Sequence, residues 1–432
     1  MSEIGKVIFE ARRKIGMSSR DLSKLTNISH NTICEIENGE RIAPSPIHLI
    51  SIAKALNLDI IDLYCLAGYL NKCVLMNRFL DISELSVDEI KQVKDFKDNI
   101  IKERVMNGMN TTNTKTLKVA SLFAGIGGIC YGFKQAGAQI IWANEIDRDA
   151  CITYRHNFGG EYLVEGDIKD VNPNDIPDID ILNGGFPCQA FSIAGYQKGF
   201  EDERGNLFFE IARILRVKKP RAILLENVKN LESHDNGNTF KVIKKTLEDL
   251  GYYVHHKVLN TMEYGNVPQN RERIYIVGFL SKKAYDAFQY PEPIKLTKTI
   301  HDIIDFNDRK PDAYYYNKSK YYPELVPVMK SQDTIYQWRR VYCRENKSNV
   351  CPTLTANMGT GGHNVPLIKD NFDIRKLTPE ECVAFQGFPT EFEFPNTISN
   401  AAKYKQAGNS VSVPVVKRVV DCLIEALNTT EE

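Results

Sequence analysis

The segment LKVASLFAGIGGICYGFKQAG, residues 117–137, constrains the fold of this chain more than any other. It reads as an apolar strand, a glycine-rich turn and a helix. Gly125, Gly127 and Gly128 let the main chain turn sharply and approach a ligand, with the N-terminus of the helix behind it. Short apolar strands and helices alternate from Leu117 to about residue 280, and this alternation predicts an α/β fold with a parallel sheet.

The rest of the chain departs from this pattern and indicates further domains. Residues 1–70 alternate short amphipathic helices with polar turns, and residues 71–116 form a helical connector that ends in the polar linker NGMNTTNTKT. The α/β region covers residues 117–280. A tyrosine- and proline-rich region follows at 281–371, and helical segments occupy 372–432. The sequence contains no internal repeat.

The composition is that of a soluble globular protein, with 55 Lys and Arg residues against 55 Asp and Glu residues. A net charge of zero excludes a surface coated in positive charge but leaves room for one basic face. The ten cysteines never fall as CxxC, so neither a disulfide scaffold nor a metal site is predicted. No apolar run approaches the roughly 20 residues that span a bilayer, and the first residues lack the features of a signal peptide. We therefore expect a cytoplasmic protein without a membrane partner.

The N-terminal region carries a helix-turn-helix pattern. A short turn at 26–28 separates two predicted helices, and Asn38-Gly39 ends the second because glycine accepts a positive φ angle. The run from Ile28 to Tyr64 resembles the lambda-repressor-like helix-turn-helix family. The predicted helices are Ile4–Ile15, a second one from Ser18 or Ser19 to Leu25, Ser29–Glu37, Pro44–Leu56 and Asp59–Ala67.

This resemblance implies that the third of these helices enters the major groove of DNA. The residues near base edges would then be Ser29, His30, Asn31 and Thr32. A helical bundle that serves dimerisation or simple packing remains the alternative for this region.

Two acidic residues at later strand ends support a ligand site at the glycine turn. The strand AQIIWANE ends in Glu145, where a carboxylate can accept hydrogen bonds from ribose hydroxyls. The segment VEGDI places Asp167 at a third strand end, suited to an adenine amino group. The spacing F-x-G-x-G-G differs from the G-x-G-x-x-G of pyrophosphate sites, which favours S-adenosylmethionine over NAD. Both acids stay open to a second interpretation, as solvated carboxylates at strand ends.

Further segments place reactive groups at the ends of predicted strands. Cys188 follows the strand DIDILNGG, and Glu226 ends the strand RAILLENV. Gln269, Arg271 and Arg273 precede another apolar strand in NVPQNRERIYIVG. A lone cysteine is more often buried and inert, but these groups converge on the sheet edge where ligands bind. No histidine lies in these motifs, so a cysteine-protease dyad is not expected.

Taken together and in this order, the motifs resemble the cytosine-5 DNA methyltransferase family over residues 117–280 and 372–425. The matching segments are Phe123–Gly128 (first cofactor motif), Gly185–Gln189 (catalytic loop), Glu226–Val228 (acid motif), Gln269–Arg273 (QxRxR motif), Arg375–Glu381 and Gly408–Val411 (last two motifs). The resemblance implies a Rossmann-like, S-adenosylmethionine-dependent methyltransferase sheet. It also implies a smaller target-recognition domain at 281–371.

The resemblance assigns catalytic roles to Cys188, Glu226, Arg271 and Arg273. It assigns cofactor binding to Phe123, Gly125, Ile126, Gly127, Gly128, Glu145, Ile146, Asp167, Ile168, Gly185, Pro187, Leu207, Asn409, Ser410 and Val411. Both ends of the α/β region would therefore build the cofactor pocket.

Methylation of cytosine at C5 explains why this set of groups is needed. C5 is a poor nucleophile, and addition of the Cys188 thiolate to C6 gives an enamine whose C5 can attack a sulfonium methyl group. A protonated Glu226 would stabilise charge at N3 and the amino group, so we expect burial to raise its pKa. Arg273 would hold the base carbonyl and orient Glu226. No side chain is assigned as the base that removes the C5 proton, and an ordered water is expected.

A cytosine inside a duplex must be flipped out to reach such a pocket. The resemblance gives this task partly to the loop at 189–204, with Gln189 and Ser192 facing DNA. Base reading is expected within 336–362. The candidate contacts there are Arg339, Arg340, Arg344, Thr360, Gly361 and Gly362. Base-edge and phosphate contacts stay equally open for the arginines, and a CCNGG-like target is a guess from resemblance alone.

These observations predict a sequence-specific DNA methyltransferase of a restriction–modification system. Its partner would be double-stranded DNA, and the N-terminal region would bind a separate operator and repress transcription of its own gene or of a partner nuclease gene. A monomer is enough for methylation, while a dimer through the N-terminal region stays open. The competing interpretations are a DNA-binding regulator with secondary catalysis and an RNA cytosine-5 methyltransferase.

Overall fold

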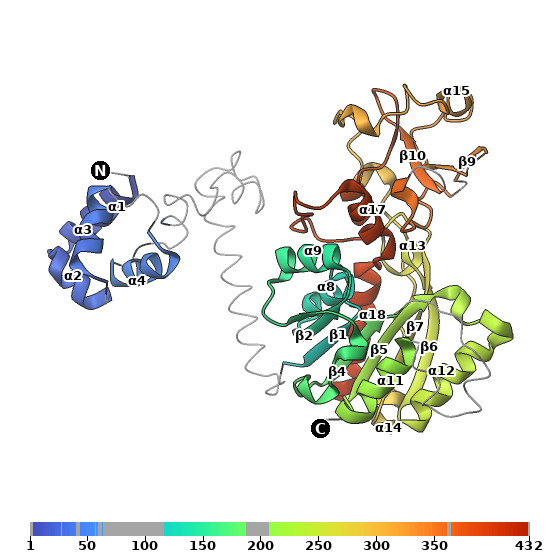
Figure 1. Ribbon diagram of the computed structural model, residues 1–432, viewed down its shortest axis with the longest axis horizontal. Coiled ribbons are helices and arrows are strands. Elements are labelled where there is room, and N and C mark those ends of the chain that lie inside the picture. Colours follow the sequence, from blue (N-terminus) through green and yellow to red (C-terminus); the bar gives the residue numbers. More distant parts are fainter. Residues whose placement is uncertain are drawn as a thin grey trace. The chain divides into compact units, whose positions relative to one another are not determined.

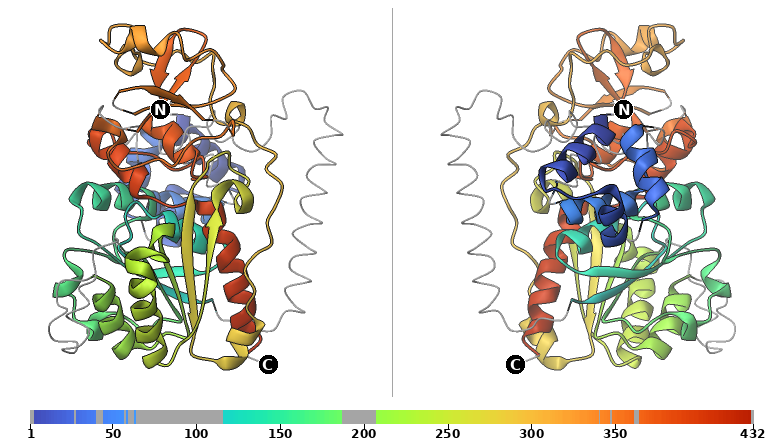
Figure 2. Two further views of the ribbon diagram at one scale, coloured as in Figure 1. Left: turned by 90° about the vertical axis from the view of Figure 1, so that its right-hand side faces the viewer. Right: turned by 90° about the vertical axis from the view of Figure 1, so that its left-hand side faces the viewer.

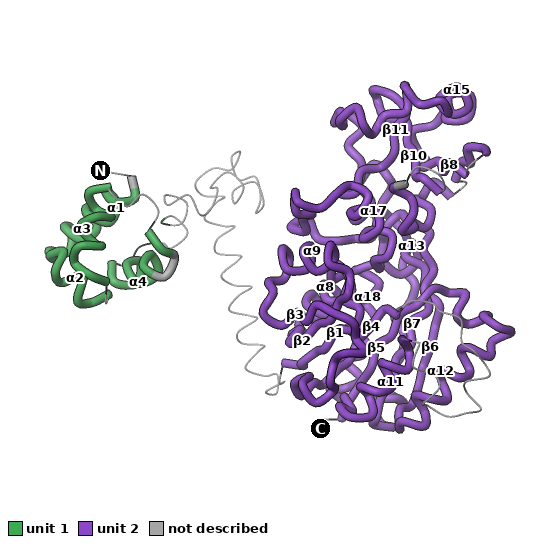
Figure 3. Tube along the Cα trace, viewed as in Figure 1, with its two compact units in different colours: residues 1–113 green, residues 114–432 purple. Residues whose placement is uncertain are grey.

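The computed structural model describes residues 3–26, 28–39, 44–56, 58, 63, 116–186, 207–339, 341–346, 348–360 and 364–430. The chain divides into two compact units, residues 1–113 and 114–432 (Figure 3). Apart from Leu63 and Thr116, the predicted helix at 59–67 and the connector at 71–116 lie outside the described residues. Within the described part of the chain, no helix is long and apolar enough to cross a membrane.

The second unit is built on a seven-stranded sheet with the order β3-β2-β1-β4-β5-β7-β6 (Figure 1). The strands are β1 Lys118–Leu122, β2 Gln139–Glu145, β3 Leu163–Glu165, β4 Ile181–Gly185, β5 Ala222–Val228, β6 Tyr253–Asn260 and β7 Glu272–Phe279. The strand order switches direction between β1 and β4. Ligands of open α/β sheets bind at such a switch point, and the glycine turn follows β1 there.

Strand β7 runs antiparallel to both of its neighbours, so the prediction of a parallel sheet is wrong for this strand. The segment 261–271 joins β6 to β7 and holds only the four-residue helix α13, Thr261–Tyr264. A parallel return needs a crossover of about a dozen residues or more, usually with a full helix. The chain therefore turns back beside β6. As a result, β7 begins at the sheet edge where β4 and β5 end.

Both faces of this sheet are covered by helices (Figure 2). Successive residues of β5 alternate between two cores, with Ala222 and Leu224 in one and Ile223 and Leu225 in the other. Burial on both faces explains why the strand is continuously apolar. The first core includes helices α8 Gly128–Gln135, α9 Arg148–Phe158, α14 Lys282–Ala287 and α18 Val413–Asn428, and the second includes α11 Leu207–Lys218 and α12 Asn238–Asp249.

The C-terminal helix α18 packs closely on α8, although the two are far apart in sequence. A Cβ atom at Gly132 of α8 would lie only 2.4 Å from Cγ1 of Val416. The missing side chain at position 132 therefore allows the two helices to approach. Val415, Val416 and Val419 join the same core as Val119 of β1.

A smaller antiparallel sheet with the order β11-β10-β8-β9 follows in the chain. Its strands are β8 Tyr336–Trp338, β9 Cys343–Glu345, β10 Val365–Lys369 and β11 Ile374–Lys376. The apolar core of this subdomain consists of Leu325, Met329, Tyr336, Trp338, Val365, Leu367 and Ile374. The neighbouring helices are α15 Tyr322–Leu325, α16 Pro379–Ala384 and α17 Asn400–Asn409.

A buried arginine joins this small sheet to the helices that follow it. The Nε of Arg375 donates to Oδ2 of Asp370 at 2.7 Å, and its two terminal nitrogens donate to Glu381 at 2.8 Å. Glu381 also accepts from the N–H of Thr378 and closes a capping box at the start of α16. One guanidinium thus ties the turn before β11 to the helix after it.

The N-terminal head consists of α1 Glu3–Lys14, α2 Ser19–Thr26, α3 His30–Asn38 and α4 Pro46–Leu56 around one apolar core. The first three helices agree with the predicted ones to within one residue at each end. Helix α4 begins two residues later than predicted because Ser45 accepts from the N–H of His48 at 3.4 Å, which leaves Pro46 at the first helical position. Gly39 ends α3 with a φ of 83°.

An ion pair between Arg12 of α1 and Glu37 of α3 is buried within the head. The Nε and Nη2 atoms of Arg12 donate to the two carboxylate oxygens at 2.7 and 2.6 Å, and Nη1 donates to the carbonyl of Met17 at 2.8 Å. Removal of one partner would leave the other charge buried without compensation.

Replacing Arg12 by alanine is therefore expected to destabilise the head by about 3–5 kcal/mol. Hydrogen exchange of the intact chain would show faster exchange of the α1 and α3 amides, with unchanged protection in unit 114–432. The double change Arg12→Met with Glu37→Leu should restore most of the protection because no charge is left buried. Unchanged exchange in Arg12→Ala would contradict a structural role for the pair.

Candidate active site

The glycine turn after β1 depends on residues without side chains. Gly125 and Gly127 have φ angles of 55° and 86°. A Cβ atom at Gly127 would lie 2.1 Å from the ring of Phe158, and one at Gly128 would lie 2.7 Å from Oγ of Ser410. Because position 128 has no side chain, the segment that follows α17 can pack directly against the glycine turn.

Glu145, at the end of β2, holds the turn in place. Its Oε2 accepts from the N–H of Gly125 at 2.8 Å, and its Oε1 accepts from the N–H groups of Ile146 and Asp147 at 2.9 and 2.8 Å. A carboxylate has about four acceptor sites, so these bonds leave capacity for a ligand hydroxyl. The side chain of Ile146 beside it is 62% exposed and adds apolar surface.

Gly125, Gly128, Glu145 and Ile146 line a cavity of about 390 Å³ at the carboxyl edge of the sheet, whereas Gly127, also predicted as a cofactor residue, is not part of its lining. This volume is typical of pockets for small ligands. The predicted cofactor residues in its lining are Phe123, Gly125, Ile126, Gly128, Glu145, Ile146, Gly185, Leu207, Asn409, Ser410 and Val411. Residues that follow the first strand and residues near the C-terminus therefore enclose one space.

Asp167 and Ile168 do not belong to this lining. The Oδ1 of Asp167 accepts from the N–H of Lys169 at 3.0 Å and caps the short 3-10 helix Ile168–Asp170. Ile168 is buried in the core beneath α11. Both residues thus have local structural roles in this structure. Pro187 lies outside the described residues.

Glu226 and Arg273 lie together at the edge where β5 ends and β7 begins. The Nε of Arg273 is 3.1 Å from Oε1 of Glu226, and both residues line the cavity. The sheet register pairs Gly185 with Glu226. A Cβ atom at Gly185 would be 3.3 Å from Oε2 of Glu226, so the end of β4 directly faces the carboxyl group.

Burial raises the pKa of Glu226, while the charges of Arg273 and Arg271 act in the opposite direction. The 3.1 Å contact with Arg273 lacks hydrogen-bond geometry, so Oε1 has no hydrogen-bond partner among the described residues. A buried carboxyl group with a raised pKa is suited to donating a proton or a hydrogen bond.

Arg271 lies behind this pair and is only 2% exposed. Its Nη1 donates to the carbonyl of Leu354 at 2.9 Å, and its Nη2 donates to the carbonyls of Gly408, at 3.2 Å, and Ser410. Burial lowers the pKa of Arg271 to about 9, which still leaves it charged at neutral pH. The guanidinium therefore holds main-chain segments together at the back of the cavity.

Asn227 holds the main chain just before the segment that contains Cys188. Its Nδ2 donates to the carbonyl of Phe186 at 2.8 Å, and its Oδ1 accepts from the N–H of Val228 at 2.8 Å. Phe186 is the last residue before 187–206, which lie outside the described residues. Cys188, Gln189 and Ser192 fall within that stretch.

A second, polar cavity of about 260 Å³ lies between the QNRER segment and the small sheet. It brings together Arg339 and Arg344, two of the predicted DNA contacts. Its full lining is Asn270, Gln337, Arg339, Arg344, Asn346, Pro352, Thr353, Thr355 and Asn364. Thr360 ends the 3-10 helix Met358–Thr360, and Arg340, Gly361 and Gly362 lie outside the described residues.

In the head, the four predicted DNA contacts lie at the N-terminus of α3. The Oγ of Ser29 accepts from the N–H of Thr32 at 3.2 Å. The same Oγ lies 2.8 Å from Oγ1 of Thr32. The Nε2 of His30 is 3.1 Å from Oγ of Ser19, at the start of α2. Asn31 is exposed. The first turn of α3 therefore presents Asn31 to solvent, while the other three residues also make contacts inside the head.

Comparison with known proteins identifies the second unit. A family model described as C-5 cytosine-specific DNA methylase matches residues 117–425. The chain belongs to this family. A helix-turn-helix family model matches residues 8–63. The predicted methyltransferase fold, DNA (cytosine-5) methyltransferase activity and helix-turn-helix head are thus confirmed.

Named relatives agree with this assignment. The methylase is 55% identical to the Type II methyltransferase M.Bsp6I of Bacillus sp. (strain RFL6) over 315 residues, which are 72% of this chain and 99% of the relative. It is 45% identical to the Type II methyltransferase M.HaeII of Haemophilus aegyptius over 316 residues, 73% of this chain and 95% of the relative. The structure of S. pombe Dnmt2 methyltransferase shares the fold, with a TM-score of 0.56, 21% identity and coverage of 73% of this chain and 100% of that chain.

Two features of the site were missed by reasoning from the sequence. Nζ of Lys405 donates to Oδ2 of Asp147 at 2.6 Å, and both line the 390 Å³ cavity. These residues are 258 positions apart, and no local pattern links them. The role of Asn227 was also missed, although its place directly after the strand-end acid was a usable signal.

The raised pKa of Glu226 has a measurable effect on stability. The folded protein holds this proton more tightly than the unfolded chain does. Protonated Glu226 therefore adds stability to the folded protein. This added stability is fully present below the ordinary carboxyl pKa and is lost as the pH rises through the raised pKa of Glu226. Glu226→Gln removes the group with little change of shape. The unfolding free energy of the methylase minus that of the variant should fall with pH, by at most about 1.4 kcal/mol per pH unit. Denaturant unfolding across this range would measure it, and a pH-independent difference would contradict the raised pKa.

Proposed function

We propose that this methylase transfers the methyl group of S-adenosylmethionine to C5 of a cytosine flipped out of duplex DNA, and that it protects DNA from a cognate restriction enzyme. The main support is that the 390 Å³ cavity and the Glu226–Arg273 pair share one sheet edge. The Type II methyltransferase names of its relatives agree with a restriction–modification role.

The cavity suits S-adenosylmethionine. Ile146 offers an exposed apolar face for an adenine ring, and Glu145 next to it has acceptor capacity for ribose hydroxyls. Ser410 and Val411 pack against Gly128 at the N-terminus of α8, where a dinucleotide pyrophosphate would otherwise lie. The bound cofactor would supply an electrophilic methyl group.

Cys188 is the proposed nucleophile. Its thiolate forms a bond to C6 of the cytosine, and the electron pair of the C5–C6 double bond makes C5 nucleophilic. C5 would then take the methyl group, while the pair of the broken methyl–sulfur bond would stay on the sulfur of the cofactor, which leaves as a neutral thioether. A base, expected to be water, then removes the C5 proton. The Cys188–C6 bond breaks with its electron pair returning to sulfur. The bond from Asn227 to the carbonyl of Phe186 fixes the chain two residues before this cysteine.

Glu226 and Arg273 would stabilise the charge that develops on the ring. The raised pKa of Glu226 keeps the carboxyl protonated to a higher pH, so that it can donate to N3 and accept from the amino group. Arg273 would orient Glu226 and bind the base carbonyl. Arg271 acts as a positioning residue because its terminal nitrogens already bind three main-chain carbonyls.

Replacement of Cys188 by alanine should reduce methylation at least roughly a thousandfold, since the C6 addition is lost. The measurement is bisulfite sequencing of unmethylated plasmid DNA after incubation with protein and S-adenosylmethionine, which also maps the target site. Cys422→Ala, at a half-buried position of α18, is the matched control and should keep full activity. Methylcytosine formed by Cys188→Ala at the normal rate, or none formed by the unchanged protein, would refute the mechanism.

The head supplies a second part of the proposal, binding to a separate operator and repression of its own gene or of a partner nuclease gene. The helix-turn-helix match and the exposed Asn31 on the first turn of α3 support it. Recognition helices contact base edges mainly through their N-terminal residues.

Footprinting of the full chain on DNA upstream of its gene should reveal one protected segment. Asn31→Ala should weaken that protection at least about fivefold, by loss of a base contact. Asn38→Ala, the same change at the exposed far end of α3, should not, and both variants should methylate plasmid DNA normally. If no specific segment is protected, the operator proposal fails.

A further inference from the structure

An ion pair joins two walls of the 390 Å³ cavity. Nζ of Lys405, on α17, donates to Oδ2 of Asp147, at the start of α9, and both residues line the cavity. Their side chains are 56% and 30% exposed, so the contact lies at the rim of the cavity. We call Lys405 and Asp147 the rim pair. An exposed ion pair adds little to the stability of a fold, so this position points to a role in ligand binding.

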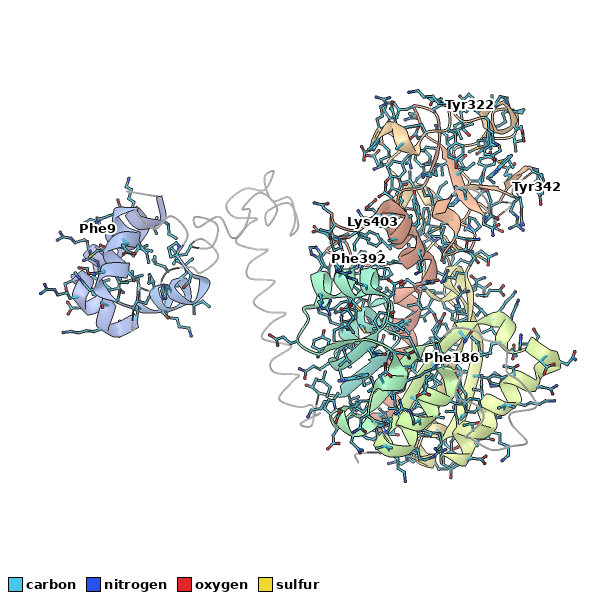
Figure 4. All side chains as sticks on the ribbon, in the orientation of Figure 1. Phe9, Phe186, Tyr322, Tyr342, Phe392 and Lys403 are labelled. Atoms are coloured by element: carbon cyan, nitrogen blue, oxygen red, sulfur yellow. The ribbon has the colours of Figure 1, made fainter. Side chains whose placement is uncertain are left out.

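Helix α17 turns one face towards the cavity. Lys405 and Asn409 lie one helical turn apart, and both are exposed and line the cavity. Lys403, labelled in Figure 4, precedes Lys405 by two residues, is not part of the lining and pairs with Glu380 at 3.8 Å. The contact with Asp147 therefore depends on the position of residue 405 on the helix.

A buried hydrogen bond holds α17 against α9 below the rim pair. Oγ1 of Thr153, on α9, donates to Oε1 of Gln406 at 2.8 Å. Thr153 is fully buried and Gln406 is 6% exposed, and Gln406 directly follows Lys405 in the chain. Because this bond already fixes the two helices, formation of the rim pair orders only two side chains and costs little conformational entropy.

Asp147 is bonded to Glu145, the residue proposed to bind the ribose. The N–H of Asp147 donates to Oε1 of Glu145 at 2.8 Å, and its Oδ1 caps α9 by accepting from the N–H of Ala150 at 3.1 Å. The rim pair uses the other carboxylate oxygen, Oδ2. Lys405 therefore holds a residue whose main chain orients Glu145. The hydrogen bond with Asp147, and the nearby charges of Asp149 and Glu145, raise the pKa of Lys405, so its ammonium group stays charged.

We propose that Lys405 is a positioning residue for the adenosine half of S-adenosylmethionine. Through the rim pair it fixes Asp147, and so it holds Glu145 in the orientation that accepts from the ribose hydroxyls. This inference rests on the proposed function, since it concerns how that cofactor is held. Direct binding of the cofactor carboxylate by Lys405 fits less well, because its Nζ is already bonded to Asp147, and Asp149 and Glu145 nearby would repel a further carboxylate.

The rim pair would act equally on substrate and product. S-Adenosylmethionine and S-adenosylhomocysteine share the adenosine half, so loss of the pair should weaken both to the same degree. Interactions that bind the ground state and the transition state equally affect KM and leave the chemical step alone.

Matched variants of the full chain isolate the rim pair. Lys405→Met removes the charge and keeps most of the side-chain length, and Lys405→Arg keeps the charge. Asp147→Asn removes the charge but keeps the cap of α9, because asparagine caps helices as well as aspartate does. Lys417→Met is the control. Lys417 pairs with Asp421 at 2.6 Å on α18, with similar side-chain exposures of 39% and 43%, and neither residue lines the cavity.

The test is calorimetric titration with S-adenosylmethionine, S-adenosylhomocysteine and methylthioadenosine, an adenosine thioether without the amino-acid tail. Lys405→Met and Asp147→Asn should each raise the Kd of all three ligands about three- to fivefold, the range of an exposed ion pair. The double variant should lose no more than either single one, since the pair is lost only once. Lys405→Arg should restore most of the affinity, and Lys417→Met should match the unchanged protein. In methylation assays the loss should fall on the KM for S-adenosylmethionine and not on kcat.

Salt gives an independent measurement. Methylthioadenosine is uncharged, so ionic strength acts on its binding through charges of the protein. Its Kd for the unchanged protein should rise towards that of Lys405→Met between about 0.05 and about 0.5 M NaCl, because salt screens an exposed pair. The Kd for Lys405→Met should stay constant over the same range.

Three results would overturn the inference while leaving the proposed function intact. The first is an unchanged Kd for all three ligands in both Lys405→Met and Asp147→Asn. The second is a loss confined to the two ligands with an amino-acid tail, which would mean that Lys405 binds the cofactor carboxylate directly. The third is an equal loss in Lys417→Met, which would indicate a general effect of removing a surface charge. If the unchanged protein binds none of the three ligands, the proposed function itself fails, and the inference fails with it.

Discussion

The second unit depends on one buried guanidinium, that of Arg271. Its terminal nitrogens bind the carbonyls of Leu354, Gly408 and Ser410, which come from two segments far away in sequence. A buried charge without a directly bonded carboxylate is stable only when dipoles surround it, so these segments must come together for the unit to fold. The same contacts place Ser410 against Gly128 and so build a wall of the 390 Å³ cavity.

The chemistry follows from the direction of β7. Because this strand runs antiparallel, its first residues lie at the edge where β4 and β5 end, and Arg273 meets Glu226 there. Burial at this edge raises the pKa of Glu226, while Asn227 holds the chain that leads to Cys188. Glu226 and Asn227 lie on β5 and Arg273 lies on the neighbouring strand β7. A small change in the register of these strands would therefore separate the three side chains.

The features that could be predicted from the sequence are those that depend only on residues close together in the chain. The glycine turn, Glu145 and the strand-end position of Glu226 could be read from short motifs, because each depends on one strand and the turn after it. The direction of β7 could not, since it depends on the length of the connection through α13. The roles of Arg271 and Lys405 depend on partners 83 to 258 residues away. Asp167 and Ile168 were predicted as cofactor residues from their motif; Asp167 caps a short 3-10 helix and Ile168 packs in the core, and their role in cofactor binding stays a prediction.

Buried arginines recur beside the two elements for which the sequence predicts DNA contacts. Arg12 binds Glu37 on α3, the helix that carries Asn31, and Arg375 binds Asp370 and Glu381 around the last strand of the small sheet. A paired buried charge adds less stability than apolar packing of the same volume, but its two-pronged geometry permits few alternative arrangements. Both elements are small and offer limited apolar surface. Because the chain has zero net charge, a broadly basic surface is excluded, and any DNA contact made by these two elements depends on the accurate placement of a few polar groups.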